Sequence, residues 1–196
     1  MAQTSTDTAQ APAIGNPAVV GLGGFGMTTL LLQFHNLGWI DIGPVIWCGF
    51  VFGGFAQLIA GFQEQKTGNN FGFAAFAGYG AFWIMLCAYL LGSTSGNPML
   101  KLSENDLGFL MLVWAMFTGG LWIASFKISK AMWFTFLTLL IGFILLALVF
   151  WGNKSLLPLA AWDLIVCALT AWYMMFHVIF LSVFGRDVLP VGKPLA

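Results

Sequence analysis

The chain has 196 residues, of which 60% are hydrophobic and 7% are charged, and its formal net charge is zero. A water-soluble domain with so few charged side chains would not keep its surface solvated, so this composition excludes that class and favours a lipid bilayer as the solvent. We expect membrane lipid as a partner and no nucleic acid.

The first fifteen residues are polar and contain no Lys or Arg. Because no isolated short apolar core follows them, they do not match a cleaved signal peptide, and we predict a disordered cytoplasmic tail over residues 1–15. Six apolar stretches follow, separated by short polar breaks: residues 17–37, 42–62, 70–91, 107–126, 131–151 and 156–181. Each has roughly 20 residues, the length that a helix needs to cross about 30 Å of hydrocarbon.

These stretches predict an all-α integral membrane protein, a six-transmembrane-helix bundle over residues 16–185, followed by a second cytoplasmic tail over residues 186–196. Basic residues set the orientation, because cytoplasmic loops carry more Lys and Arg than the opposite side does. Six spans place both termini on one side, and the basic residues divide unequally: Lys66, Lys127, Lys130, Arg186 and Lys193 on that side against Lys101 and Lys154 on the other. We therefore expect both termini in the cytoplasm and the chain in the inner membrane.

The first apolar stretch begins with the string NPAVVGLGGFGMTT, which holds four glycines and no charge. We predict that Asn16 caps this helix. Thr28 and Thr29 add hydroxyls at mid-depth, and a helix start with free N–H groups is suited to attract a small anion. Glycines recur in later spans at small-xxx-small spacings, as at Gly49 and Gly53, which let helices approach closely in lipid.

Ionisable side chains are nearly absent from the interior of the spans. Besides Tyr and Cys, the ones present are His35, Asp163 and His177, each near a helix end. A voltage sensor or a proton pump with a carboxylate relay needs more such groups, so these classes are excluded. Glu64 and Lys66 fall in the short inner loop after the second stretch, where we expect solvated or helix-ending charges. A contact between protomers or a place at the mouth of the path is the alternative.

Two histidines raise the alternative of a redox membrane anchor that holds a haem between paired axial ligands. On the predicted topology His35 lies near the outer face and His177 near the inner face, so they cannot share one iron within a protomer. The three cysteines lie inside the spans without a metal-binding spacing, and no span holds paired carboxylates or a Ser-His grouping. We therefore expect no metal, no cofactor and no enzymatic activity.

The opening string also resembles the signature of the acetate uptake transporter family, Asn-Pro-Ala-Pro-Leu-Gly-Leu-x-Gly-Phe-Gly-Met-Thr-Thr. Residues 16–18 and 21–29 match this pattern, whereas Val19 and Val20 replace the Pro-Leu of the family and leave the helix start more regular. The likeness continues along the chain through residues 34–36, 53–57, 64–69, 79–83 and 184–192. Several motifs in order are more specific than one, and the resemblance covers everything after the first fifteen residues.

This resemblance implies a six-helix protomer, a homohexamer, and passage of acetate and related short carboxylates such as succinate through a pore within each protomer. Members of the family narrow the pore with a Phe, a Tyr and a Leu, which fall here on Phe25, Tyr79 and Leu139. Counted from the predicted cytoplasmic helix starts, all three residues lie about 12 to 14 Å deep, near the bilayer midplane.

The residue types suggest how a carboxylate passes. Neutral donors hold an anion loosely enough to release it, and we expect this role, or a place in a vestibule, for a polar set: Asn16, Thr28, Thr29, Asn36, Gln57 and the Tyr79 phenol. A carboxylate that passes an apolar ring loses its hydration, which is energetically costly, so the protonated acid crosses more readily. A coupled proton would then be carried on the substrate itself. A passive channel for other small anions or neutral solutes shares nearly every one of these features and remains the alternative.

Overall fold

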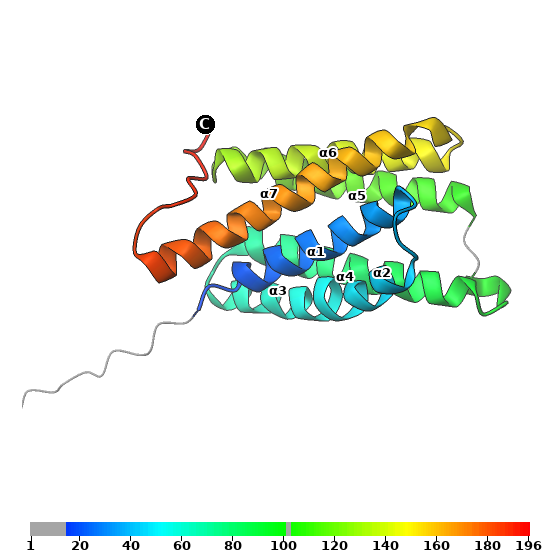
Figure 1. Ribbon diagram of the computed structural model, residues 1–196, viewed down its shortest axis with the longest axis horizontal. Helices are drawn as coiled ribbons and strands as arrows, with labels where there is room; N and C mark the ends of the chain where they lie inside the picture. The colour runs from blue at the N-terminus through cyan, green and yellow to red at the C-terminus, as the bar shows by residue number, and fades with distance from the viewer. Residues whose placement is uncertain (1–14, 101–102) are drawn as a thin grey trace, which may run out of the picture.

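The computed structural model describes residues 15–100 and 103–196, and within these ranges the chain is built of helices and turns without a strand (Figure 1). Long helices alternate in direction through the bundle. The elements are α1 (Ala18–Asn36), α2 (Gly43–Cys48), the π-helix η1 (Gly49–Ala56), α3 (Gln57–Lys66), α4 (Asn70–Ser93), the short η2 (Pro98–Leu100), α5 (Glu104–Ser125), α6 (Lys130–Phe150), the short η3 (Lys154–Leu156) and α7 (Leu157–Phe184).

Six of the helical segments in the described ranges are long and apolar enough to cross a bilayer, which confirms the predicted number of spans. The second span is one continuous rod formed by α2, η1 and α3, and it runs from Gly43 to Lys66. The sequence prediction ended this span at residue 62, because the last turn is polar. The last turn is helical nonetheless, which carries Glu64 into the bundle. The predicted tail over residues 1–15 lies outside the described residues except for Gly15.

Helix starts follow the sequence signals. The Asn16 side chain accepts a hydrogen bond from the backbone N–H of Ala18 at 2.9 Å and so satisfies a free donor at the start of α1. The N-cap position itself falls on Pro17, one residue later than predicted, because the helix begins at Ala18. Asn69 caps α4 by accepting from the Gly72 N–H at 3.0 Å. These hydrogen bonds fix where α1 and α4 begin.

The helix α1 lies against α7, η1, α3 and α4 (Figure 1). Glycines make this contact close, because a Cβ at Gly24 would meet the backbone oxygen of Phe52. The contact between α3 and α4 is equally close, because a Cβ at Gly61 would meet the backbone of Ala77. In lipid such backbone approach replaces the hydrophobic drive that holds helices together in water. The predicted role of Gly53 is confirmed as well, because a Cβ there would overlap the Thr28 side chain.

We call the end of the bundle at which α1 begins and α7 ends the inner end, and the opposite end the outer end (Figure 1). The C-terminal segment, residues 185–196, runs back across the inner end. The N–H of Ala131 donates to Val191 O at 3.0 Å, and the N–H of Leu195 donates to Phe126 O at 2.9 Å. These bonds tie the segment to the junction between α5 and α6.

We predict that Gly61→Ala destabilises the protein, because the added methyl group forces α3 and α4 apart at the Ala77 backbone. Overpacking of this kind costs about 1–3 kcal/mol, seen as a lower melting temperature of the purified protein in detergent. Gly43→Ala is the matched control, since no atom lies within 4 Å of a Cβ at that position. Equal melting temperatures for the two variants would contradict the assigned contact.

Candidate functional site

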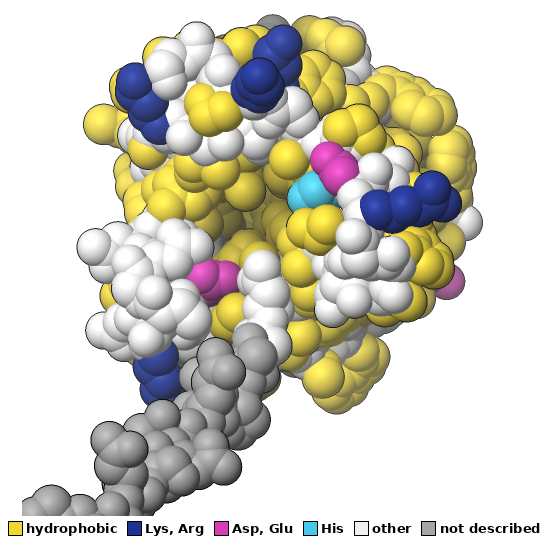
Figure 2. Space-filling model, turned by 90° about the vertical axis from the view of Figure 1, so that its left-hand side faces the viewer, with side chains coloured by type: hydrophobic (Ala, Val, Ile, Leu, Met, Phe, Trp, Pro, Cys, Tyr) yellow, Lys and Arg dark blue, Asp and Glu magenta, His cyan; other side chains and the backbone are white. Residues whose placement is uncertain are grey.

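A cavity of about 70 Å³ opens at the inner end, between α1, α3, α4 and α6. Figure 2 looks onto this end and shows a central hollow whose wall is mostly hydrophobic. We call it the inner cavity. Apolar side chains such as Leu22, Phe71 and Phe136 supply most of its wall.

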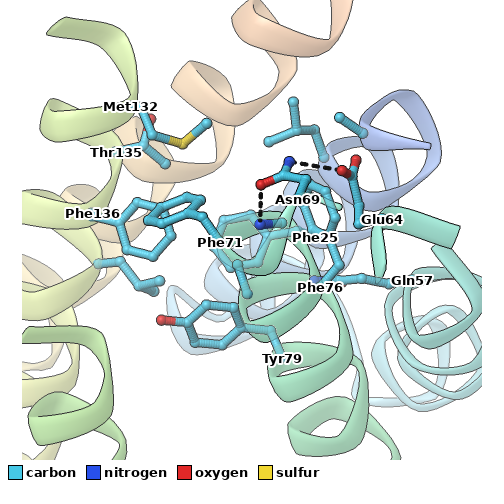
Figure 3. Close-up of a pocket in the computed structure, with 15 residues that line it drawn as sticks. Phe25, Gln57, Glu64, Asn69, Phe71, Phe76, Tyr79, Met132, Thr135 and Phe136 are labelled. Carbon is cyan, nitrogen blue, oxygen red and sulfur yellow. Dashed lines mark hydrogen bonds between the residues drawn. The ribbon is translucent and has the colours of Figure 1, made fainter. Parts of the chain in front are cut away.

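Four polar side chains besides Tyr79 also line the inner cavity: Gln57, Glu64, Asn69 and Thr135 (Figure 3). The Thr135 hydroxyl is already bonded to Ala131 O and Thr170 Oγ1, both at 2.9 Å. Gln57 and Glu64 lie on the buried face of α3, two turns apart, and Asn69 lies just before α4. Asn69 donates its Nδ2–H to Glu64 Oε2 at 2.7 Å. Glu64 Oε1 and both polar atoms of the Gln57 amide have no hydrogen-bond partner among the described residues.

The inner cavity ends at Phe25, Tyr79 and Leu139, which also line a second, central cavity. The rings of Phe25 and Tyr79 lie 5.7 Å apart between centroids, inclined at 55°. All three side chains are buried. The structure therefore brings the three residues together, one each from α1, α4 and α6, as an apolar boundary between two spaces.

The hydroxyl of Tyr79 is already engaged at this boundary. It lies 2.8 Å from Thr118 Oγ1, and the Thr118 hydroxyl donates its own proton to Trp114 O at 2.7 Å. Tyr79 is therefore the donor to Thr118, and its O–H is not free to donate to a solute. The phenol expected as a donor to a carboxylate instead anchors α4 to α5.

The central cavity measures about 30 Å³, room for about two water molecules. Thr29 and Gln33 supply its polar wall. Its far side is a second apolar boundary, because three side chains line both this space and the next one: Leu32, Phe82 and Leu146. A solute larger than water must displace side chains to pass from one boundary to the other.

The outer cavity is the largest of the three, at about 330 Å³. His35, Asn36 and Lys154 contribute its polar and charged groups. Lys154 forms an ion pair with Glu104 at 2.6 Å across the outer surface. The three cavities thus follow one another from the inner to the outer end, linked by shared apolar side chains.

Some of the predicted polar residues line the cavities, and the others are used in packing between helices or at a helix start. Gln57 lines the inner cavity, Thr29 the central one and Asn36 the outer one. Thr28 lines none of them: its hydroxyl donates to Gly24 O at 2.7 Å, and its side chain fills the space that Gly53 leaves. The cavities therefore give no support to its predicted contact with substrate. Asn16 likewise lines none of the three, and its side chain bonds to the Ala18 N–H at the start of α1.

Glu64 lies in the last turn of α3, as a helix-ending charge, but it is 3% exposed and not solvated, and sequence reasoning did not include it among the site residues. The spacing of the buried positions on α3 was a usable signal, because residues 57, 60, 61 and 64 form one helical face. The second boundary repeats the first at helical spacing: Leu32 lies seven residues after Phe25, and Leu146 seven after Leu139.

The two histidines lie at opposite ends of the bundle. His35 lines the outer cavity, whereas the His177 Nδ1 lies 2.8 Å from Leu189 O in the C-terminal segment at the inner end. They cannot be paired axial ligands of one haem within a protomer, as expected.

Fold and cavities together define a multi-pass helical membrane protein with an internal path for small solutes. The chain belongs to the GPR1/FUN34/yaaH family, whose sequence model matches residues 2–184. This confirms the family resemblance inferred from the motifs.

Relatives in this family cover nearly the whole chain. The succinate-acetate/proton symporter SatP of Escherichia coli is 38% identical over 186 residues, which span 92% of this chain and 96% of the relative. Acetate permease A of Emericella nidulans is 30% identical over 84% of this chain and 61% of its own length. A solved structure of the bacterial acetate channel SatP superposes with a TM-score of 0.87 at 38% identity, covering 92% of this chain and all of that chain.

We predict that Tyr79→Phe lowers the melting temperature, because it leaves the buried Thr118 oxygen without its donor at a cost of about 1 kcal/mol. Tyr173→Phe is the matched control. Its hydroxyl donates to Pro190 O at an exposed site, where water replaces the lost bond. Thermal unfolding in detergent measures both, and a larger effect from Tyr173→Phe would refute the assignment of a buried donor at Tyr79.

Proposed function

We propose that the protein moves acetate and related short carboxylates such as succinate across the membrane, through a path within each protomer. The row of three cavities through the bundle carries this proposal, since a small solute can cross it by displacing only the side chains at the two apolar boundaries. The acetate and succinate named for its relatives supply the substrate class. The function is transport and not catalysis.

The lining chemistry supports a path for weakly held carboxylates. No Lys or Arg lines the inner or central cavity among the described residues. The uncharged polar groups there include the Gln57 and Gln33 amides and the Thr29 hydroxyl. Neutral donors bind an anion without trapping it, which a path must do if the solute is to leave. At the outer cavity, the charge of Lys154 is balanced by its ion pair with Glu104, so it does not trap an anion there either.

The apolar boundary at Phe25, Tyr79 and Leu139 supports movement of the carboxylate together with a proton. An unpaired carboxylate loses its hydration there without gaining a partner, whereas the neutral acid does not carry that cost. The Escherichia coli relative is named a proton symporter, in keeping with this coupling.

We further propose that the protein lies in the cytoplasmic inner membrane with its inner end in the cytoplasm, following the excess of basic residues there. A homohexamer is the proposed assembly. The outward face of α5 supports it, since Gly120 leaves open space where a second helix can approach. Large apolar side chains flank that position: Val113, Met116, Phe117 and Ile123.

A passive channel is the second candidate, because the related solved structure is described as an acetate channel. The proton-coupled transporter and the passive channel differ in whether a proton gradient drives acetate accumulation. We expect radiolabelled acetate to accumulate in proteoliposomes above the level of protein-free liposomes when the outside is more acidic. Collapse of the gradient with a protonophore is the control. Transport that merely equilibrates acetate under this gradient supports the channel, and no transport at all refutes the proposed function.

We predict that Phe25→Ala and Leu139→Ala raise acetate flux or admit larger acids, because each opens the boundary between the inner and central cavities. Initial uptake rates in proteoliposomes, with acetate and with bulkier monocarboxylates, measure the effect. Leu169→Ala is the matched control, since Leu169 is 49% exposed on the outside of α7. Wild-type rates and selectivity in both boundary variants would show that these side chains do not restrict the path.

A further inference from the structure

A carboxylate that the path does not yet use lies in the wall of the inner cavity. Glu64 is 3% exposed and Gln57 is fully buried, and both line this cavity (Figure 3). Glu64 Oε1 and the Gln57 Nε2 and Oε1 atoms have no hydrogen-bond partner among the described residues. Buried polar atoms are nearly always paired, so three such atoms in one cavity indicate a site that a ligand completes.

The Asn69 amide shows which oxygen of Glu64 takes a proton. Its Oδ1 accepts from the Gly72 N–H at 3.0 Å, so its Nδ2 must be the atom that donates to Glu64 Oε2 at 2.7 Å. Oε2 is therefore occupied as an acceptor. A proton on Glu64 sits on Oε1, the oxygen without a partner in the structure.

Within residues 15–100 and 103–196, the surroundings of Glu64 provide no charge to pair with it. The elements packed against α3 are α1, η1 and α4, and their titratable side chains are His35 at the far end of α1, and Tyr79, Cys87 and Tyr89 on α4. On α3 itself, Lys66 is exposed. Since burial of a lone carboxylate is costly, a proton is the simplest neutralising partner.

We propose that Glu64 is the proton-binding residue of the inner cavity and that it binds a substrate carboxylate together with Gln57. This rests on the proposed function. The protonated Glu64 donates its Oε1–H and Gln57 donates an Nε2–H to one substrate carboxylate. Two carboxylates this close share a proton, because both cannot be ionised at low cost.

The transfer that follows is balanced. The O–H bond at Glu64 Oε1 breaks and an O–H bond forms on the substrate, which leaves Glu64 ionised and the substrate as the neutral acid. The neutral acid then crosses the apolar boundary at Phe25, Tyr79 and Leu139, and Glu64 takes a new proton from water at the inner end. Movement in the opposite direction reverses each step. One proton therefore accompanies each carboxylate group that crosses.

The test is the pH dependence of acetate binding, measured on the purified full chain by the stabilisation that acetate gives against thermal unfolding. Above the range in which free Glu64 is protonated, the wild-type Kd is expected to weaken about tenfold per pH unit, since one proton binds with each acetate. Glu64→Gln keeps a donor but cannot titrate, so its Kd is expected to be independent of pH. Asp41→Asn, an exposed carboxylate removed, is the control and should follow the wild type.

Two further variants separate proton binding from a structural role. Gln57→Leu removes one donor, so it is expected to weaken binding at every pH while the slope persists. Glu64→Asp retains a titratable group that is too short to reach the same position, so the slope persists with weaker binding. If Glu64→Gln does not fold, Glu64→Asp still tests the proposal. Wild-type affinity for acetate at every pH in Glu64→Asp would contradict the proposed role of Glu64.

A wild-type slope in Glu64→Gln would overturn the proposal, because the proton would then be carried on acetate itself. That outcome leaves the transport function intact. Failure of the wild-type protein both to bind acetate and to transport it would instead refute the proposed function. The two failures are therefore distinguishable within one set of measurements.

Discussion

Close backbone contact around α1 is the constraint on which the rest of the structure depends. Gly24 lies against the backbone of Phe52 in η1, and Gly26 leaves room for Trp172 of α7. A membrane gives no hydrophobic drive to hold such helices together, so the small residues supply the packing. Because these glycines hold α1 against its neighbours, the one large aromatic side chain among them, Phe25, is fixed opposite Tyr79 at the boundary between the cavities.

The packed interior of the bundle holds almost no charged side chains, so the role of each buried polar atom can be read from its hydrogen bonds. The Thr28 and Tyr79 hydroxyls complete bonds inside the protein. Gln57 and Glu64 instead keep atoms unpaired at the wall of a cavity. This contrast separates polar groups that hold helices from polar groups that wait for a ligand, although both kinds are equally buried.

Much of the fold was predictable, because hydropathy and length are strong signals for membrane helices. The close packing at Gly53 also followed from residue type, and the helix start near Asn16 was predicted to within one residue. The residues of the site were harder to predict than the fold. Thr28 and Thr29 are neighbours of the same type, and only the rotation of α1 decides that one faces η1 and the other the central cavity. The burial of Glu64 was missed because the sequence pattern ended the second span before the last turn of α3, where the helix in fact continues to Lys66.

The unequal cavities have a consequence for inhibitors. The outer cavity, about 330 Å³, exceeds the inner one, about 70 Å³, and the narrow space between them lies behind the apolar side chains Leu32, Phe82 and Leu146. A bulky acid that fits the outer cavity is too large for the inner cavity. Such a molecule acts as a plug from one face of the membrane only, so the sidedness of blockade follows from the shape of a single protomer.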